Sequence, residues 1–97
     1  MTGHDIEVNY TNARLQADGL RNEAEELRRV AKEYENTLVE LGGIWTGKEA
    51  QQFVATARKH TGRMNQAVSR LNQLAQAIDK AAEAYRKAET QKLQAQN

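Results

Sequence analysis

Apolar residues recur at alternating intervals of four and three along two long stretches of this 97-residue chain. In the first stretch every position of this frame is apolar or aromatic. The positions are Ile6, Tyr10, Ala13, Ala17, Leu20, Ala24, Leu27, Ala31, Tyr34, Leu38 and Leu41. Such spacing predicts a helix that packs along one side against another helix, with a gentle left-handed supercoil. The alanines in the frame would let that second helix approach closely.

The same frame resumes after the middle of the chain, with two polar exceptions, Thr61 and Glu89. The second set is Ala50, Val54, Ala57, Thr61, Met64, Val68, Leu71, Ala75, Ile78, Ala82, Tyr85 and Glu89. A flanking row is also mostly apolar and consists of Phe53, His60, Ala67, Leu74, Ala81 and Ala88. The second helix therefore has a wider apolar face than one antiparallel neighbour would cover, which predicts a further contact surface, as in a four-helix bundle.

We therefore predict an all-α fold, an antiparallel helix-turn-helix hairpin that dimerises into a four-helix bundle. It is expected to be a single domain over residues 1–97, with helices at about 6–41 and 47–93 and a turn at 42–46. The ends, residues 1–5 and 90–97, are expected to be frayed, and the second helix to overhang the first. The expected core of the hairpin or dimer is Ala17, Leu20, Ala24, Leu27, Ala31, Tyr34, Leu38, Phe53, Val54, Ala57, Met64, Val68, Leu71 and Ile78. Gly19 and Gly62 fall off the seam and are interpreted as tolerated surface glycines rather than sites of close helix crossing.

The only tryptophan, Trp45, lies between the two stretches. Gly42 or Gly43 would suit the left-handed position that ends a helix. Thr46 and Glu49 have the spacing of a capping box. Trp45 and Ala50 would then form a hydrophobic staple. The segment is thus expected to start the second helix, with the indole as a hydrophobic plug at the end of the bundle.

The sequence gives no indication of catalytic activity. There is no cysteine, and the two histidines, His4 and His60, stand in no metal-ligand or acid–base spacing. No metalloprotease, phosphate-loop or nucleophile-elbow motif occurs. We expect no catalytic, cofactor-binding or metal-binding residues, and no enzyme. Since only 39% of the residues are hydrophobic, we expect a partner chain to complete the core.

Targeting signals and the distribution of charge limit which functional classes remain. No apolar run approaches the ~20 residues of a membrane span, and the first residues lack the features of a secretory signal. This favours the cytoplasm or a non-standard export route. Residues 1–47 carry five basic and nine acidic groups, and residues 48–97 carry nine and four. Mutual attraction of antiparallel helices explains this difference. The alternative, a basic helix for anionic lipid or nucleic acid, lacks interleaved aromatic residues.

Two short motifs complete the pattern: Trp45-Thr46-Gly47 in the turn and Tyr85-Arg86-Lys87-Ala88-Glu89 near the C-terminus. With them, the chain resembles the WXG family of small secreted bacterial proteins, the early-secreted-antigen type. The resemblance implies substrates of the type VII (ESX-like) secretion system that leave the cell folded. It also implies head-to-tail homodimers, or heterodimers with a paralogous WXG protein, that form four-helix bundles.

The resemblance further implies an export signal of the form Tyr-Xaa3-Asp/Glu, which the membrane-bound secretion ATPase recognises beside the partner's turn. Carried over, Tyr85 and Glu89 become signal residues, and Trp45, Thr46 and Gly47 the turn motif. The pattern alone would make Tyr85 the last core aromatic and Glu89 the start of a solvated tail.

The favoured prediction is a non-enzymatic protein that is cytoplasmic before export and then secreted, as an effector or an export partner. No nucleic acid and no stable membrane insertion are expected. The alternatives are an intracellular helical adaptor and a basic-helix binder of membranes or nucleic acid.

Overall fold

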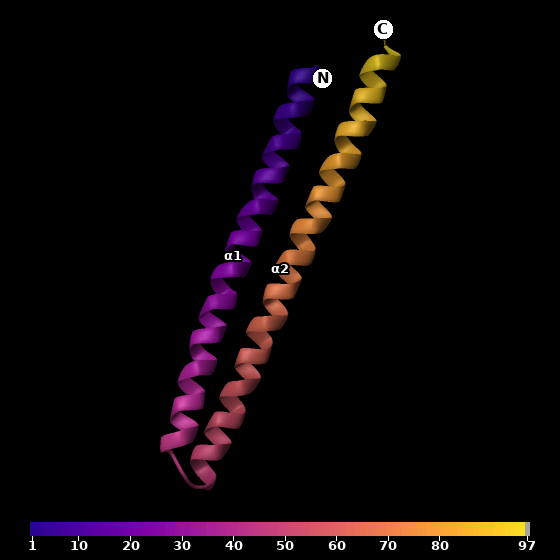
Figure 1. The fold of residues 1–97 in the computed structure, drawn as a ribbon. Helices are drawn as coiled ribbons and strands as arrows, with labels where there is room; N and C mark the ends of the chain where they lie inside the picture. The colour runs from indigo at the N-terminus through magenta and orange to yellow at the C-terminus, as the bar shows by residue number, and fades with distance from the viewer. Residues whose placement is uncertain (97) are drawn as a thin grey trace. The chain divides into compact units, whose positions relative to one another are not determined.

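The computed structural model describes residues 1–96 and contains two α-helices, α1 (Gly3–Ile44) and α2 (Lys48–Ala95). Residues 45–47 connect them, and the helices run antiparallel (Figure 1). No strand occurs within residues 1–96. The predicted all-α helical hairpin is therefore confirmed.

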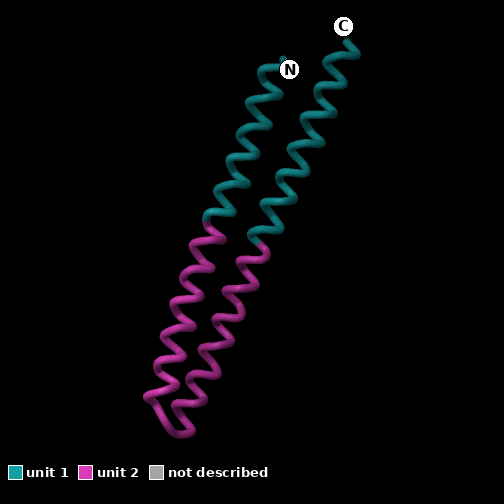
Figure 2. The backbone as a smooth tube through the Cα atoms, in the orientation of Figure 1, with its two compact units in different colours: residues 1–22, 71–97 teal, residues 23–70 magenta. Residues whose placement is uncertain are grey.

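By its backbone contacts the hairpin divides into two compact units (Figure 2). The turn unit comprises residues 23–70. The terminal unit joins residues 1–22 to the segment that begins at Leu71. Each unit contains a stretch of both helices and has its own buried residues, so each is described by itself.

The predicted frame coincides with the buried seam in both units. Every frame position from Ile6 to Leu41 and from Ala50 to Glu89 is buried or partly buried. In the terminal unit the fully buried members are Ile6, Ala17, Ala75 and Ala82, and in the turn unit they are Ala24, Ala31, Leu38, Ala57 and Thr61. Thr61 fits this seam because its hydroxyl donates to the carbonyl of Ala57, one turn earlier, at 3.4 Å.

Small side chains fill the centre of the seam. Among the largest side chains, only Ile6 and Leu38 are fully buried in residues 1–96. The other large members of the expected core are partly buried: Leu20, Leu27, Tyr34, Val54, Met64, Val68, Leu71 and Ile78. Phe53 is 50% exposed and so lies outside the core of the hairpin itself. Alanines allow the helices to approach closely, and the larger side chains beside them then remain partly uncovered.

Both helices extend beyond their predicted bounds. α1 begins at Gly3 because Thr2 and Asp5 form a capping box. The Asp5 N–H donates to Thr2 Oγ1 and the Thr2 N–H donates to Asp5 Oδ2, each at 3.1 Å. α1 therefore begins before its predicted start at about residue 6. α2 continues to Ala95, beyond its predicted end at about residue 93, and Asn97 lies outside the described residues.

The connection differs from the predicted turn. Gly42 and Gly43 lie inside α1, whose last turn includes a hydrogen bond from Trp45 N–H to Leu41 O at 2.7 Å. Gly47 instead has the left-handed backbone, with φ 109°. Its carbonyl accepts the Gln51 N–H at 3.1 Å, which makes Gly47 the N-cap of α2.

The predicted capping box is corrected as a consequence. Because α2 begins one residue later than expected, Thr46 lies outside the N-cap position. No hydrogen bond between Thr46 and Glu49 is formed in the described chain. The Trp45 ring packs against Phe53, with ring centroids 5.8 Å apart and planes tilted by 56°, and Trp45 and Ala50 line one hollow at the turn.

Candidate functional site

Trp45, Thr46 and Gly47 form an exposed apolar corner of the turn unit. Gly47 allows the left-handed backbone that an L side chain would oppose. Trp45 is 46% exposed and packs on Phe53, and Ile44 beside it is 74% exposed. In the single chain the indole is thus covered on one side and exposed on the other. With neither helix covering its outer side, the indole leaves apolar surface at the turn.

Tyr85 and Glu89 lie one turn apart on α2 in the terminal unit, and both are partly buried. The Tyr85 hydroxyl accepts a hydrogen bond from Asn9 Nδ2 at 2.9 Å and donates one to Met1 Sδ at 3.1 Å. The Glu89 carboxylate pairs with Lys92 Nζ at 3.2 Å, and its side chain is 25% exposed. The polar ends of both predicted signal residues are thus engaged within the chain.

The first turn of α1 covers this part of α2. Met1 and Ile6 line the same small hollow as Glu89 and Leu93. A Cβ atom at Gly3 would lie 3.8 Å from Leu93 Cδ2. The second helix is the longer one and extends past the start of α1, as expected (Figure 1), but α1 begins early enough to cover α2 as far as Leu93.

Asn9 is the contact that the sequence interpretation missed. It lies one turn before Ala13, in the row next to the seam frame of α1. A weak signal was present, since antiparallel alignment of the two frames brings the first turns of α1 near the last turns of α2. Nothing in the sequence indicated that this asparagine would bond to Tyr85.

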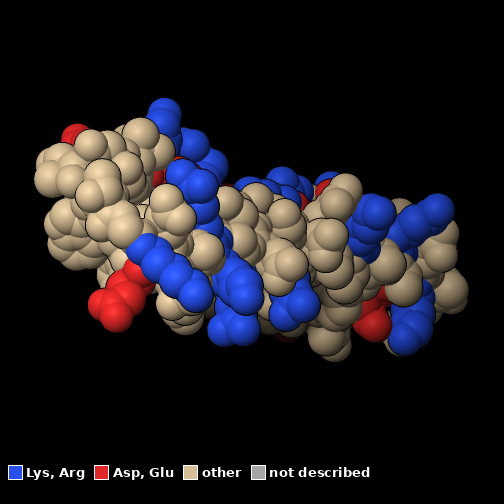
Figure 3. All heavy atoms as spheres, turned by 90° about the horizontal axis from the view of Figure 1, so that it is seen from below, with Lys and Arg blue, Asp and Glu red and all other residues tan. Residues whose placement is uncertain are grey.

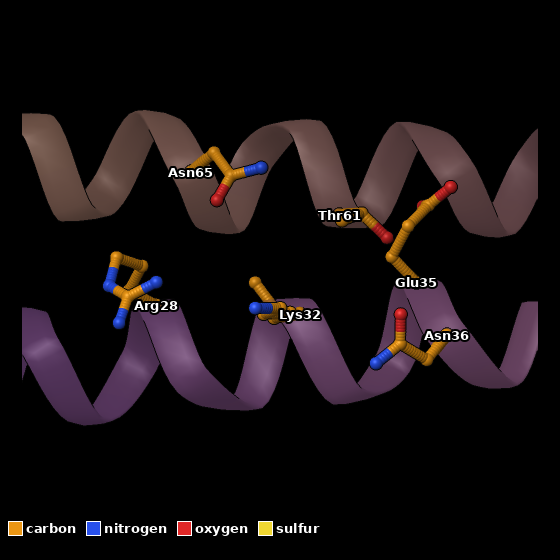
Figure 4. A pocket seen from close by; sticks show the side chains of 7 residues that line it. Arg28, Lys32, Glu35, Asn36, Thr61 and Asn65 are labelled. Atoms are coloured by element: carbon orange, nitrogen blue, oxygen red, sulfur yellow. The ribbon is translucent and has the colours of Figure 1, made fainter.

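One side of the seam is polar in each unit. In the turn unit, Figure 4 shows polar side chains on facing stretches of both helices, with Glu35 of α1 reaching toward α2. They line a hollow of about 360 Å³ together with Ala31: Arg28, Lys32, Glu35, Asn36, Thr61 and Asn65. Glu35 also pairs with Arg58 at 3.5 Å.

In the terminal unit the polar side holds an ionic network around Asp79. This carboxylate pairs with Arg14 Nε at 2.8 Å and with Arg21. A hydrogen bond to Tyr10 and the charge of Asp79 raise the pKa of Arg14. Arg86 lies 4.1 Å from the centre of the Tyr10 ring, a cation–π distance. The network links the two helices in this unit.

The other side of the seam is apolar. In the heptad frame, the rows of Leu20 and of Arg21 flank the alanine row on opposite sides. In the terminal unit the apolar side has a hollow of about 420 Å³, lined by Asn9, Ala13, Ile78, Ala81, Ala82 and Tyr85. Leu74 on the same side is 50% exposed. In the turn unit this side carries Leu27, Tyr34, Met64 and the exposed Phe53.

Charged side chains occupy the outer surfaces. Lys and Arg are prominent on the face drawn in Figure 3. Ion pairs cross the seam in both directions, from acidic α1 residues to basic α2 residues (Glu7–Arg86, 3.5 Å) and the reverse (Arg14–Asp79). The charge difference between the halves thus accounts for only some of the pairs between the helices.

Within residues 1–96, no cluster of histidine, cysteine or acidic side chains has an arrangement that could hold a metal ion. His4 and His60 are both exposed. Neither helix, over the same residues, combines the length and apolar character needed to cross a bilayer.

Comparisons with known proteins give one match. No curated protein is similar enough to count as a match. No solved structure matches either. The family model described as proteins of 100 residues with WXG, called WXG100, matches residues 5–90. This range includes both helices, the Trp45–Gly47 connection and the Tyr85–Glu89 element. The chain therefore belongs to the WXG100 family.

Proposed function

We propose that this chain is a non-enzymatic substrate of a bacterial type VII secretion system and leaves the cell folded, as a dimer of helical hairpins. The observation that carries the proposal is the WXG100 match over residues 5–90, since the family implies a small secreted type VII substrate. The chain is cytoplasmic before export. Outside the cell it acts as an effector, or it serves as a partner in the export of another protein.

The partly exposed apolar side supports the dimer. The seam buries mainly alanines, while larger side chains such as Leu27, Met64 and Ile78 remain partly uncovered. Covering them with a second hairpin would remove apolar surface from water, and each Å² is worth about 25 cal/mol. The partner is a second copy or a paralogous WXG protein. Since this chain carries both the turn motif and the C-terminal element, a homodimer is the simpler choice.

The proposed export signal consists of Tyr85 and Glu89, and the secretion ATPase recognises it. In the dimer, Trp45 and Gly47 of the other chain would complete the surface. Two observations are compatible with this role: Trp45 is 46% exposed in the single chain, and Tyr85 and Glu89 lie on one face of α2. We propose no role for nucleic acid or for stable membrane insertion.

The decisive experiment measures export from the native host. Tyr85→Ala and Glu89→Ala should leave the protein in the cell fraction. Lys87→Ala, an exposed substitution on the same helical turn, should reach the medium as the wild type does. Circular dichroism of the purified variants would establish that all of them remain helical. Normal amounts of both alanine variants in the medium would overturn the signal assignment.

A further inference from the structure

The Tyr85 hydroxyl is tied to the opposite helix. Asn9 on α1 donates to it at 2.9 Å, across 76 positions of sequence. The same hydroxyl donates to Met1 Sδ at 3.1 Å. Tyr85 is therefore held by Asn9 of α1 and by Met1, which precedes α1, in addition to its place on α2.

The side chain of Tyr85 lies where the start of α1 packs against α2. The residue is partly buried and lines, with Asn9 and Ala13, the open apolar hollow on one side of the terminal unit. One turn further along α2, Glu89 lies beside Met1 and Ile6. Ile6 itself is only 2% exposed, so α1 is docked on α2 at this level. The position of the phenol thus depends on α1 being in place.

We propose that Asn9 is a positioning residue of the export element, which couples recognition of Tyr85 to the docking of the first turns of α1. The inference rests on the proposed function of Tyr85 and Glu89. A chain whose α1 is undocked keeps the Tyr-Xaa3-Glu sequence but lacks the acceptor–donor pair that orients the phenol. The element is then complete only in the folded terminal unit, and its recognition selects folded hairpins.

The test uses the full chain in the export assay. Asn9→Leu keeps the approximate side-chain size and removes the donor, and Tyr85→Phe keeps the ring and removes the acceptor. The matched control is Asn12→Leu, at an exposed asparagine on the same helix. A hydrogen bond of ordinary net strength corresponds to a population change of about three- to tenfold. Asn9→Leu and Tyr85→Phe should each lower the exported fraction by that factor, and Asn12→Leu should not.

Two further readouts separate positioning from general stability. If the hydrogen bond is what matters, the double variant Asn9→Leu/Tyr85→Phe should export no worse than the poorer single variant. Asn9→Gln, which keeps an amide donor, should export better than Asn9→Leu. Thermal unfolding of the purified proteins identifies any variant that is unfolded at the assay temperature. Where a variant is unfolded at that temperature, all variants are compared in an export assay run at a lower temperature at which each of them is folded.

The outcomes are distinct. The role of Asn9 would be overturned if Asn9→Leu or Tyr85→Phe were exported as well as the wild type. It would also be overturned if the double variant lost export by the product of the two single losses. Both results would count even if Tyr85→Ala keeps the protein in the cell. Normal export of Tyr85→Ala and Glu89→Ala would instead remove the proposed signal itself. Reduced export of both single variants without further loss in the double variant supports the inference.

Discussion

At the residue scale, the glycines separate into two environments. Gly19, Gly42, Gly43 and Gly62 are helical, and a Cβ atom at any of them would meet no atom within 4 Å. Gly19 and Gly62 are therefore surface glycines and do not mark close helix crossing. Gly47 also has open space around it, but its φ of 109° lies in the region that L residues avoid. The same residue type thus has opposite consequences at these positions.

Substitution by alanine should show this contrast. Gly62→Ala is expected to stabilise the protein by about 0.5–1 kcal/mol, because alanine favours the helix and restricts the unfolded chain. Gly47→Ala is expected to destabilise it by about 1 kcal/mol or more, because the backbone must change or accept strain. Urea unfolding followed by circular dichroism measures both. Equal shifts for the two variants would contradict the assigned backbone conformation of Gly47.

At the element scale, the ends of the helices depend on different local interactions. α1 begins with the reciprocal Thr2–Asp5 capping box, whereas the N-cap of α2 is Gly47, which has no side chain to cap the first N–H groups. The hydrogen bonds with Thr2, first that of its backbone N–H, lower the pKa of Asp5. The N-terminal cap of α1 thus contains a titratable carboxylate. Residues next to this cap, Met1 and Ile6, line the same hollow as Glu89 and Leu93 of α2.

The cap should give a pH-dependent stability. The pKa of Asp5 is lower in the folded chain than in the unfolded chain, so the unfolded chain takes up the proton first as pH falls. The contribution of Asp5 is therefore complete at neutral pH and is lost below about pH 4, as pH falls through the folded-state pKa. Asp5→Asn should be less stable than the wild type at pH 7, with a smaller difference near pH 3.

Glu33→Gln is the control for this measurement, since Glu33 is an exposed carboxylate on the same helix. Its stability difference from the wild type should change less between pH 7 and pH 3. A stability gap for Asp5→Asn that stays constant over this range would show that the carboxylate does not cap α1.

At the scale of the whole molecule, the hairpin leaves many of its large apolar side chains only partly covered. It has only two large side chains fully buried within residues 1–96, and Leu74, Phe53 and Trp45 are about half exposed. In the terminal unit the Asp79 network occupies one side of the seam and Leu74 extends the other. A second hairpin is therefore expected on the apolar side rather than on the ionic side.

Light scattering of matched leucine variants tests this arrangement. Leu74→Glu should weaken dimerisation about 100-fold or more, because a carboxylate would be buried without a partner. Leu15→Glu is the control: Leu15 is 60% exposed and, being two residues from Ala17, lies on the far side of α1 from the seam. It should leave the dimer unchanged. A stable monomer in the wild type, or equal effects of both variants, would contradict the proposed dimer face.

The sequence by itself determined the secondary-structure class and the positions along the seam. Periodic spacing is a local property, so the frames from Ile6 to Leu41 and from Ala50 to Glu89 identify the inward side of each helix without knowledge of the partner. The polar residue Thr61 is also buried, as its position in the frame predicts. Its burial is possible because a threonine hydroxyl can bond to the carbonyl one turn earlier. The motif residues Trp45, Gly47, Tyr85 and Glu89 could also be named from sequence.

Only the tertiary structure decided which glycine turns the chain, how far Trp45 is exposed, and what holds Tyr85. Gly42, Gly43 and Gly47 all offer the same conformational freedom, and the choice among them depends on where the opposing helices close the connection. The exposure of Trp45 depends on the geometry of that connection. The hydrogen bond between Asn9 and Tyr85 joins residues 76 positions apart and depends on how the two helices are aligned. These features arise from contacts distant in sequence, which a local pattern does not encode.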